Sequence, residues 1–286
     1  MGYECFDVNI DEKIANVVLN RPEKRNSMIP AFWEELPQII RDIDDNARAR
    51  VIVISSTGPH FTSGLDVGAF AGTAGQSDDP ETQRLDRLQR AARFHGTIRS
   101  LQHTFSCLEE CRVPVIAAIQ GGCIGGGVDL ATACDMRYAT ENAFFTIYEI
   151  NIGLTADVGT FPRIAKLIPE GVARELAYTG RRMPAPEAQA VGLVNRVFPD
   201  EEAMRTEVMT IAREIAAKAP LAVYGCKRMI NYARDHATAD TLDYVGIWNA
   251  SMLQPEEIME AMSANAQKRE GDFVDLPKAK SGKGII

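Results

Sequence analysis

The sequence predicts an α/β fold with a helical extension toward its C-terminal end. Residues 51–54 and 115–119 are short, continuous apolar runs, which are typical of strands buried on both faces of a sheet. Apolar residues at helical spacing separate these runs, and beyond residue 160 the pattern is helical apart from a strand predicted over 193–198. With 286 residues, the chain is long enough to bury a sizeable core. We therefore expect a mixed core followed by helices.

Strands dominate the first part of the chain. We expect two strands over 3–8 and 13–19, joined by the polar turn 9–12. A helix is predicted over 30–43, because apolar residues recur there at helical spacing. Pro37 lies inside this stretch, so the helix either bends at the proline or begins later.

The middle of the chain contains one long predicted helix. Residues 63–66 are expected to form a loop, and 71–82 are rich in Gly, Ser, Asp and Thr, which is typical of an irregular excursion. The helix is predicted over 82–111 and ends before Pro114. The buried strand at 115–119 follows it.

Short elements and then helices complete the chain. We divide the chain into a core over 1–198 and a C-terminal helical region over 199–286. The remaining predicted elements are a helix that ends at 133, strands over 136–138 and 144–147, and helices over 208–215, 223–230 and 244–252.

Composition and charge exclude several classes of protein. The 31 basic and 39 acidic residues give a net charge of −8, which disfavours a nucleic-acid or anionic-membrane partner. No apolar run is long enough to cross a bilayer, and the acidic N-terminal residues do not resemble a signal or transit peptide. The six cysteines lack the neighbours of a zinc site, so we expect reduced thiols and no metal. Together these features predict a soluble cytoplasmic protein.

A glycine cluster at 121–127 follows the second buried strand and opens a helix. Glycine lets the backbone approach a ligand closely, and the N–H groups of a first helical turn have no acceptor within the helix. Together with the helix dipole, these N–H groups can bind an anion or an oxyanion. The alternative is a tight turn without a ligand. The cluster is not a P-loop, because no Gly-Lys-Ser/Thr follows it.

Three acidic residues lie in or near this region. Asp129 is in the first turn of the predicted helix, where a carboxylate either stabilises the helix dipole or lies beside an oxyanion site. Glu149 and Asp157 flank a mostly apolar stretch, so they either face solvent or have perturbed pKa values. Ser63 has no obvious histidine base. The residues alone therefore indicate an acid/base site near a glycine-rich helix start.

Taken together, several segments resemble the enoyl-CoA hydratase/isomerase (crotonase) superfamily. The similarity follows the chain in order from residue 3 to residue 270. The segments that carry it are 20–26, 61–66, 114–121, 125–130, 185–188 and 192–197.

The resemblance implies a crotonase-type spiral of β-β-α repeats with a helical C-terminal trimerisation region. Family members are trimers or dimers of trimers, so we expect a homo-oligomer. The implied substrate is an acyl-CoA thioester, and coenzyme A enters as part of that substrate, with no separate cofactor. By position, the N–H groups of Leu65 and Gly126 are expected to form the oxyanion hole for the thioester carbonyl.

Within the superfamily, the carboxylates resemble the Δ3,5-Δ2,4-dienoyl-CoA isomerase subgroup of unsaturated fatty-acid β-oxidation. By analogy, Asp157 removes the C2 proton, Glu149 protonates C6, and Asp129 is a supporting acid near the thioester; the reverse division between Asp157 and Glu149 stays open. The alternative is an enoyl-CoA hydratase, which has Glu at the first two acidic positions and Gly in place of Asp157. A non-catalytic or RNA-binding member is disfavoured by the net charge and by the full set of carboxylates.

The resemblance also implies contacts with coenzyme A. Lys24 and Arg25 are similar to basic residues near the nucleotide. Lys227 and Arg228 are expected on a C-terminal helix, where they either reach phosphates or belong to a solvated face. The other expected binding residues are Ser63, Gly64, Asp66 and Gly125.

Overall fold

Two sheets form the centre of the computed structural model, which describes residues 2–70 and 80–279. The larger sheet has the order β1-β2-β3-β4-β6-β9; β1 and β2 are antiparallel, and the other neighbours are parallel. Its strands are β1 (Phe6–Asp11), β2 (Ile14–Leu19), β3 (Val51–Ser56), β4 (Val115–Ile119), β6 (Met136–Thr140) and β9 (Arg196–Phe198). The smaller sheet contains β5 (Gly122–Ile124), β7 (Phe144–Thr146) and β8 (Met183–Pro184) in the order β5-β7-β8.

Strands β4 to β7 alternate between the two sheets, and each pair is followed by a helix. Strands β4 and β5 lead into α4 (Gly126–Ala133), and β6 and β7 lead into α5 (Thr160–Ile164) through η2 (Glu149–Ile152). This is the β-β-α repeat expected above. The other short elements are η1 (Pro22–Lys24), α2 (Val67–Phe70), α6 (Glu170–Thr179) and α7 (Ala185–Ala190).

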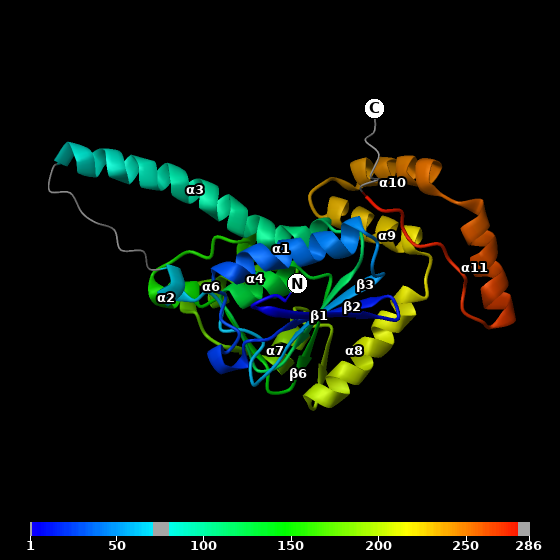
Figure 1. Ribbon diagram of the computed structural model, residues 1–286, viewed down its shortest axis with the longest axis horizontal. Helices are drawn as coiled ribbons and strands as arrows, with labels where there is room; N and C mark the ends of the chain where they lie inside the picture. The colour runs from blue at the N-terminus through cyan, green and yellow to red at the C-terminus, as the bar shows by residue number, and fades with distance from the viewer. Residues whose placement is uncertain (1, 71–79, 280–286) are drawn as a thin grey trace.

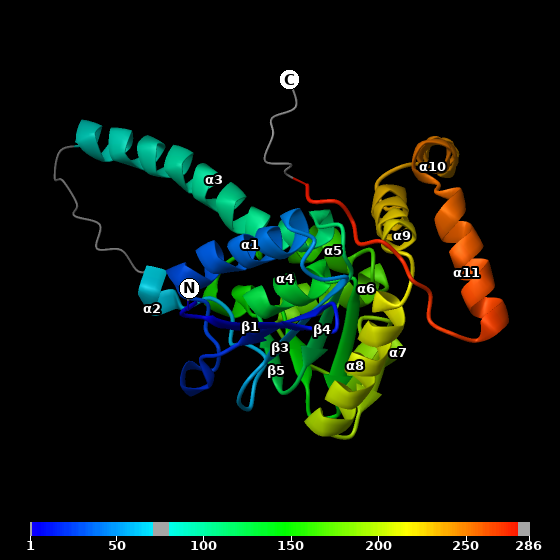
Figure 2. The ribbon, with the colours of Figure 1, turned by 45° about the vertical axis from the view of Figure 1, so that its right-hand side comes forward.

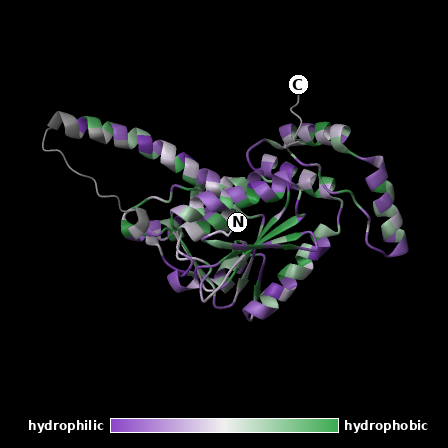
Figure 3. Ribbon diagram, in the orientation of Figure 1, coloured by the Kyte–Doolittle hydropathy of each residue, from purple (hydrophilic) through white to green (hydrophobic). Residues whose placement is uncertain are grey.

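Both faces of the larger sheet are covered, which explains the continuous apolar runs in its strands. Ile52 and Ile54 of β3 belong to one buried cluster together with the apolar face of α1 (Pro30–Asp45). Val51 and Val53, which alternate with them, belong to a second cluster together with α8 (Glu201–Ala216). Figures 1 and 2 show α1 and α8 on opposite sides of the strands, and Figure 3 shows the hydrophobic character of the strands between them.

The first hairpin differs from its predicted register. Strand β1 continues through Asp11, and the turn consists of Glu12 and Lys13, whose φ angles are 47° and 63°. The prediction of a turn over 9–12 is therefore wrong, because Ile10 pairs with Ala15 within the sheet.

Helix α1 runs through Pro37, so the alternative of a late helix start is wrong. Proline has no N–H to donate to the carbonyl of Trp33, four residues earlier. The Thr104 hydroxyl donates to this carbonyl instead, at 3.1 Å, from α3 (Pro80–Glu110). This bond fixes α3 across α1 and satisfies a buried acceptor.

Helix α3 begins at Pro80, so it includes the end of the predicted irregular excursion over 71–82. Residues 71–79 of that excursion lie outside the described part of the chain. The N-terminal half of α3 projects from the body of the protein in two views (Figures 1 and 2), and Leu88 and Phe94 on it are exposed. Its C-terminal half packs on α1 and α4.

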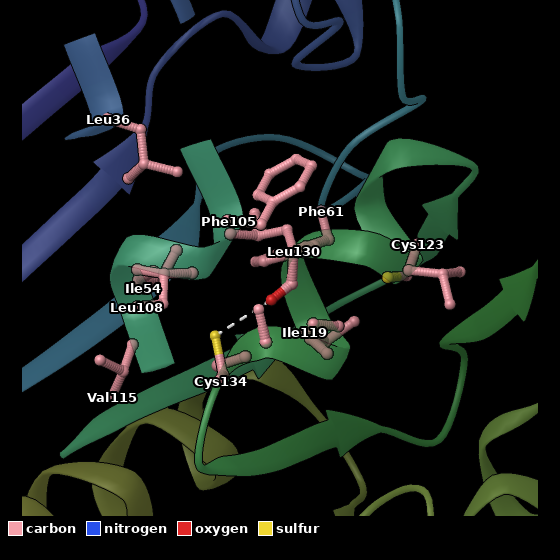
Figure 4. Close-up of a cluster of buried hydrophobic side chains, with 14 of the residues drawn as sticks. Leu36, Ile54, Phe61, Phe105, Leu108, Val115, Ile119, Cys123, Leu130 and Cys134 are labelled. Carbon is pink, nitrogen blue, oxygen red and sulfur yellow. Dashed lines mark hydrogen bonds between the residues drawn. The ribbon is translucent and has the colours of Figure 1, made fainter. Parts of the chain in front are cut away.

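Every residue of α4 is buried. Figure 4 shows Leu130 of α4 among Phe105 and Leu108 of α3 and Ile119 of β4. The Cys134 thiol donates to the carbonyl of Leu130 at 3.3 Å, and the six cysteines are unbridged, as predicted. This packing holds α4 rigidly, so its N-terminus has a fixed position.

Residues 201–267 are mostly helical, as predicted. After α8 come α9 (Pro220–Ala233), α10 (Thr238–Met252) and α11 (Pro255–Gln267), which extend away from the two sheets (Figures 1 and 2). Among the described residues, no helix is long and apolar enough to span a bilayer. The division of the chain at residue 198 stays a prediction.

Candidate active site

An open cavity of about 270 Å³ lies beside the N-terminus of α4. Six of the residues singled out from the sequence line this cavity: Ser63, Leu65, Gly125, Gly126, Glu149 and Asp157. Most of the remaining wall is apolar and includes Trp33, Leu101 and Val158. The cavity therefore combines an apolar wall with a few polar groups, which is typical of a small-molecule site.

Two backbone segments meet at one side of the cavity. Gly64 has a φ of 80°, and a Cβ atom there would lie 2.6 Å from the carbonyl oxygen of Ile124 and 3.2 Å from the nitrogen of Gly126. Only glycine permits this approach without strain. The segment is held by Met28, whose N–H donates to the carbonyl of Gly64 at 2.8 Å and whose carbonyl accepts from the N–H of Asp66 at 3.1 Å.

This arrangement leaves two N–H donors without acceptors. Gly126 is the first residue of α4, so its N–H has no acceptor within the helix. Within residues 2–70 and 80–279, neither the N–H of Gly126 nor that of Leu65 donates to a protein acceptor. Both residues line the cavity. A pair of adjacent, rigidly held N–H groups can bind an oxyanion.

Glu149 lies next to these donors. A Cβ atom on Gly125 would lie 3.1 Å from Oε1 of Glu149, and this close approach and the φ of 53° favour glycine beside the carboxyl group. The other oxygen, Oε2, is buried and has no hydrogen-bond partner among the described residues. Burial raises the pKa of Glu149, and the negative charge of Asp157 raises it further. The carboxyl group is therefore suited to carry a proton.

Asp157 is the more exposed of the two acids in the cavity wall. It lies in the segment between Gly153 and Gly159, which both have positive φ angles. Partial burial raises the pKa of Asp157. Because the charge of Asp157 acts on Glu149, the two carboxyl groups lie close enough to interact through the cavity.

Asp129 differs from the other two acids because it is completely buried and is not part of the cavity wall. Its Oδ1 accepts from the N–H of Thr160 at 2.6 Å, and its Oδ2 has no partner among the described residues. Burial and the neighbouring Glu149 raise the pKa of Asp129 to about 7. Its carboxyl group therefore ties α4 to the start of α5 and interacts electrostatically with the cavity.

Of the residues expected to contact coenzyme A, some line the cavity and others lie beside it. Lys24 and Arg25 are exposed, and the carbonyl of Arg25 accepts from the N–H of Ser63 at 2.9 Å, so this loop borders the cavity. Asp66 accepts at Oδ2 from the Ser27 hydroxyl at 3.0 Å.

Both expectations for Lys227 are wrong. Its side chain is buried, its Nζ lies 2.9 Å from Oδ2 of Asp135, and it donates to the carbonyls of Leu108 and Val113. These partners compensate a buried charge, so Lys227 connects α9 to the core instead of binding phosphate. Arg228 is exposed and donates to the Tyr244 hydroxyl at 3.1 Å.

The apolar wall of the cavity was not identified from the sequence. Trp33 follows the helical spacing of core residues and is indeed buried, but it also lines the cavity. Leu101 is part of the long helix α3 and carries no separate signal. Helical periodicity predicts which face is covered, but it does not predict whether a ligand or a side chain covers it.

The chain is similar to a known protein family and to named proteins over most of its length. A family model described as enoyl-CoA hydratase/isomerase matches residues 9–276. A human mitochondrial Δ3,5-Δ2,4-dienoyl-CoA isomerase is 43% identical over 279 residues, which cover 97% of this chain and 84% of the relative. A peroxisomal Δ3,5-Δ2,4-dienoyl-CoA isomerase from Arabidopsis thaliana is 39% identical and covers 96% of this chain and 97% of the relative. Relatives named as hydratases are more distant, at 30% and 32% identity.

A solved structure is also similar over the whole chain. The enoyl-CoA hydratase from Bacillus anthracis superposes with a TM-score of 0.82 at 29% identity and covers 97% of this chain and 100% of its own. The expected fold class is thereby confirmed. The expectation of a cytoplasmic location is contradicted, because the similar isomerases are named as mitochondrial or peroxisomal proteins.

Proposed function

This chain belongs to the enoyl-CoA hydratase/isomerase family, and we propose that it converts a 3,5-dienoyl-CoA to the 2,4-dienoyl-CoA in the β-oxidation of unsaturated fatty acids. The observation that carries this proposal is the placement of Glu149 and Asp157 together in one cavity, beside two N–H groups without acceptors. The similarity to isomerases over nearly the full chain supports it.

The thioester end of the substrate binds at the start of α4. We place the thioester oxygen between the N–H groups of Leu65 and Gly126. Removal of a proton from C2 turns the thioester into an enolate, so negative charge develops on this oxygen. Donors that are already in place need no reorganisation, and each typically lowers the barrier by about 3–4 kcal/mol.

Two acids are required because the proton leaves and returns at distant atoms. Asp157 takes the C2 proton, the electrons move along the conjugated chain, and Glu149 delivers a proton to C6, four bonds from C2. One carboxylate cannot reach both carbon atoms of an extended chain. Transfer through two positioned groups keeps each step within hydrogen-bonding distance.

The environments of the two acids support this division. Glu149 has a buried, unpartnered oxygen and a raised pKa, which favours the protonated acid at the start of the reaction. Asp157 is more exposed, which favours the ionised base. After one turnover Asp157 holds the proton and Glu149 is ionised, so a proton must pass back between them or exchange with solvent before the next turnover.

The hydratase alternative is less well supported. A hydratase of this family holds its attacking water between the acids at positions 129 and 149. Here Asp129 is bonded to Thr160 and is not on the cavity wall, so it is poorly placed to hold a water against the substrate. We assign Asp129 as a supporting acid whose protonation is coupled to the charge of Glu149.

The coenzyme A portion is proposed to extend from the cavity past Ser63 and Asp66. The loop with Lys24 and Arg25 borders Ser63 and offers two positive charges to phosphate groups. Gly64 and Gly125 allow the close approaches within the protein that were described above, and we expect both to contact the coenzyme A ester. The proposed proton transfers need no cofactor besides the coenzyme A of the substrate.

We propose that the C-terminal helices mediate a homotrimer or a dimer of trimers. Large apolar side chains on α10 and α11 are exposed in the single chain, including Leu242, Ile247 and Met262. Burial of such side chains between subunits is favourable. Light scattering of the purified protein should give a trimer or hexamer mass, and a monomer mass would contradict this proposal.

The reaction is tested by ultraviolet absorbance. With 3,5-octadienoyl-CoA, the purified protein should produce the conjugated 2,4-dienoyl thioester band at a rate far above its hydration of crotonyl-CoA. Hydration of crotonyl-CoA without any change in the diene would make the chain a hydratase and would contradict the proposal.

A further inference from the structure

Helix α3 presents a row of polar side chains to the segment that carries Asp157. Gln102, Ser106 and Glu109 are spaced four and three residues apart, so they lie on one face of the helix. All three contact residues between 157 and 163. We call these three side chains the α3 ridge.

The contacts of the α3 ridge lie at both ends of that segment. Gln102 donates from Nε2 to the carbonyl oxygen of Asp157 at 2.8 Å. Arg163 donates from Nη2 to the Ser106 hydroxyl at 3.0 Å and lies 2.6 Å from Oε2 of Glu109. The side chains of Arg163 and Glu109 are only 10% and 19% exposed, so this ion pair is largely shielded from solvent.

Gly159 makes room for this arrangement. A Cβ atom there would lie 1.7 Å from Nη1 of Arg163, and its φ of 134° disfavours other residues. The Arg163 guanidinium therefore lies directly against the backbone two residues after Asp157. The next residue, Thr160, is held by its N–H bond to Asp129.

The part of the segment before Asp157 has much less support. Residues 151–155 are exposed, and Gly153 adopts a positive φ of 74°. Among the described residues other than Asp157 itself, Gln102 is the one whose side chain is hydrogen-bonded to the backbone of Asp157. Ala156 and Val158, on either side of Asp157, are buried in the core, and the bond from Gln102 adds a polar contact from α3 to the peptide that carries the carboxylate.

We propose that Gln102 is a positioning residue that, with Arg163, holds Asp157 at the distance required for proton transfer at C2. This inference rests on the proposed role of Asp157. Leu101, the neighbour of Gln102, lines the same cavity, so one turn of α3 both shapes the wall and fixes the base. A base displaced by about 1 Å can lose a large part of its rate although the substrate still binds.

The test compares Gln102→Leu and Gln102→Glu with a control on the same helix. Leucine has no donor, and an ionised glutamate can only accept, so both changes remove the bond to Asp157. Thr97→Val is the control, because the exposed Thr97 hydroxyl donates to the backbone carbonyl of Arg93 within α3 itself. We expect kcat for the diene to fall between about tenfold and about a hundredfold in both Gln102 variants. KM should stay within about twofold of the wild-type value, because the substrate contacts are retained.

Amide hydrogen exchange gives a second readout that does not depend on activity. The amides of residues 154–160 should exchange faster in Gln102→Leu than in the wild type, and Thr97→Val should change neither exchange nor kcat. Unchanged exchange together with unchanged kcat in Gln102→Leu would overturn the positioning role, as would a rise in KM alone. If Gln102→Leu speeds exchange but the wild type does not isomerise the diene, the contact between Gln102 and Asp157 is supported and the proposed function is refuted.

Discussion

Replacement of Asp129 by Asn should change the dependence of stability on pH. Asp129 is completely buried, and burial followed by the charge of Glu149 raises its pKa from 3.8 to about 7. The folded state therefore binds a proton at this site more tightly than the unfolded state does. Stability is highest where both states are protonated, and it falls as pH rises from about 4 to about 7.

The size of this effect follows from the pKa difference. The difference between 3.8 and about 7, at about 1.4 kcal/mol per pH unit, corresponds to at most about 4 kcal/mol in the free energy of unfolding. The wild type loses this stability between pH 4 and pH 7. Asn has the same shape and keeps an acceptor for the N–H of Thr160, but it has no charge to bury. The stability of Asp129→Asn should therefore not fall in this way between pH 4 and pH 7.

Thermal unfolding of the two proteins at pH 5 and pH 8 measures the difference directly. Titrating groups that do not interact with Asp129 cancel when the two proteins are compared, whereas the coupled titration of Glu149 is part of the measured difference. At about 2 °C per kcal/mol for a chain of this size, Asp129→Asn should melt up to about 8 °C above the wild type at pH 8, and the difference should shrink at pH 5. A difference that is the same at both pH values, or a less stable variant at pH 8, would refute the assignment of Asp129 as a buried acid with a raised pKa.

Two other predictions concern the chemistry of the site. Gly64→Ala places a Cβ atom 2.6 Å from the Ile124 carbonyl and should displace the oxyanion donors, which lowers kcat by about 10²–10³; a wild-type kcat would contradict this placement of the thioester. Glu149→Gln should reduce isomerisation more than Asp129→Ala does, because Glu149 lines the cavity and Asp129 does not; steady-state kinetics of the two variants in parallel would show the reverse order if the roles were exchanged.

Much of the fold could be predicted because its central elements have strong local patterns. The apolar run at 115–119 corresponds to β4, and the last glycines of the cluster at 121–127 open α4, whereas the short strand β5 within the cluster has no such pattern. The sequence also predicted both acids of the cavity wall, although only the resemblance distinguished them from solvated loop residues. Periodicity and glycine placement are local properties, so they can be recognised without the tertiary structure.

The features that could not be predicted depend on contacts between distant residues. Pro37 suggests a bend or a later start of the helix, but the hydroxyl of Thr104 replaces the missing donor and α1 runs through the proline. The charge of Lys227 suggests an exposed or phosphate-binding residue, but Asp135 and two carbonyls compensate this charge in the core. The contact between Gln102 and Asp157 joins residues 55 positions apart, and no local pattern reveals it.

The role of Asp157 is tested most directly with the variant Asp157→Asn and 3,5-octadienoyl-CoA. Growth of the 2,4-dienoyl thioester band should slow by about 10²–10⁴ relative to the wild type, because the general base is lost. Binding of a non-reacting acyl-CoA should stay close to the wild-type affinity, since binding and proton transfer are separable. A wild-type rate in this variant, or an equal loss of affinity and rate, would contradict the account of Asp157 as the base at C2.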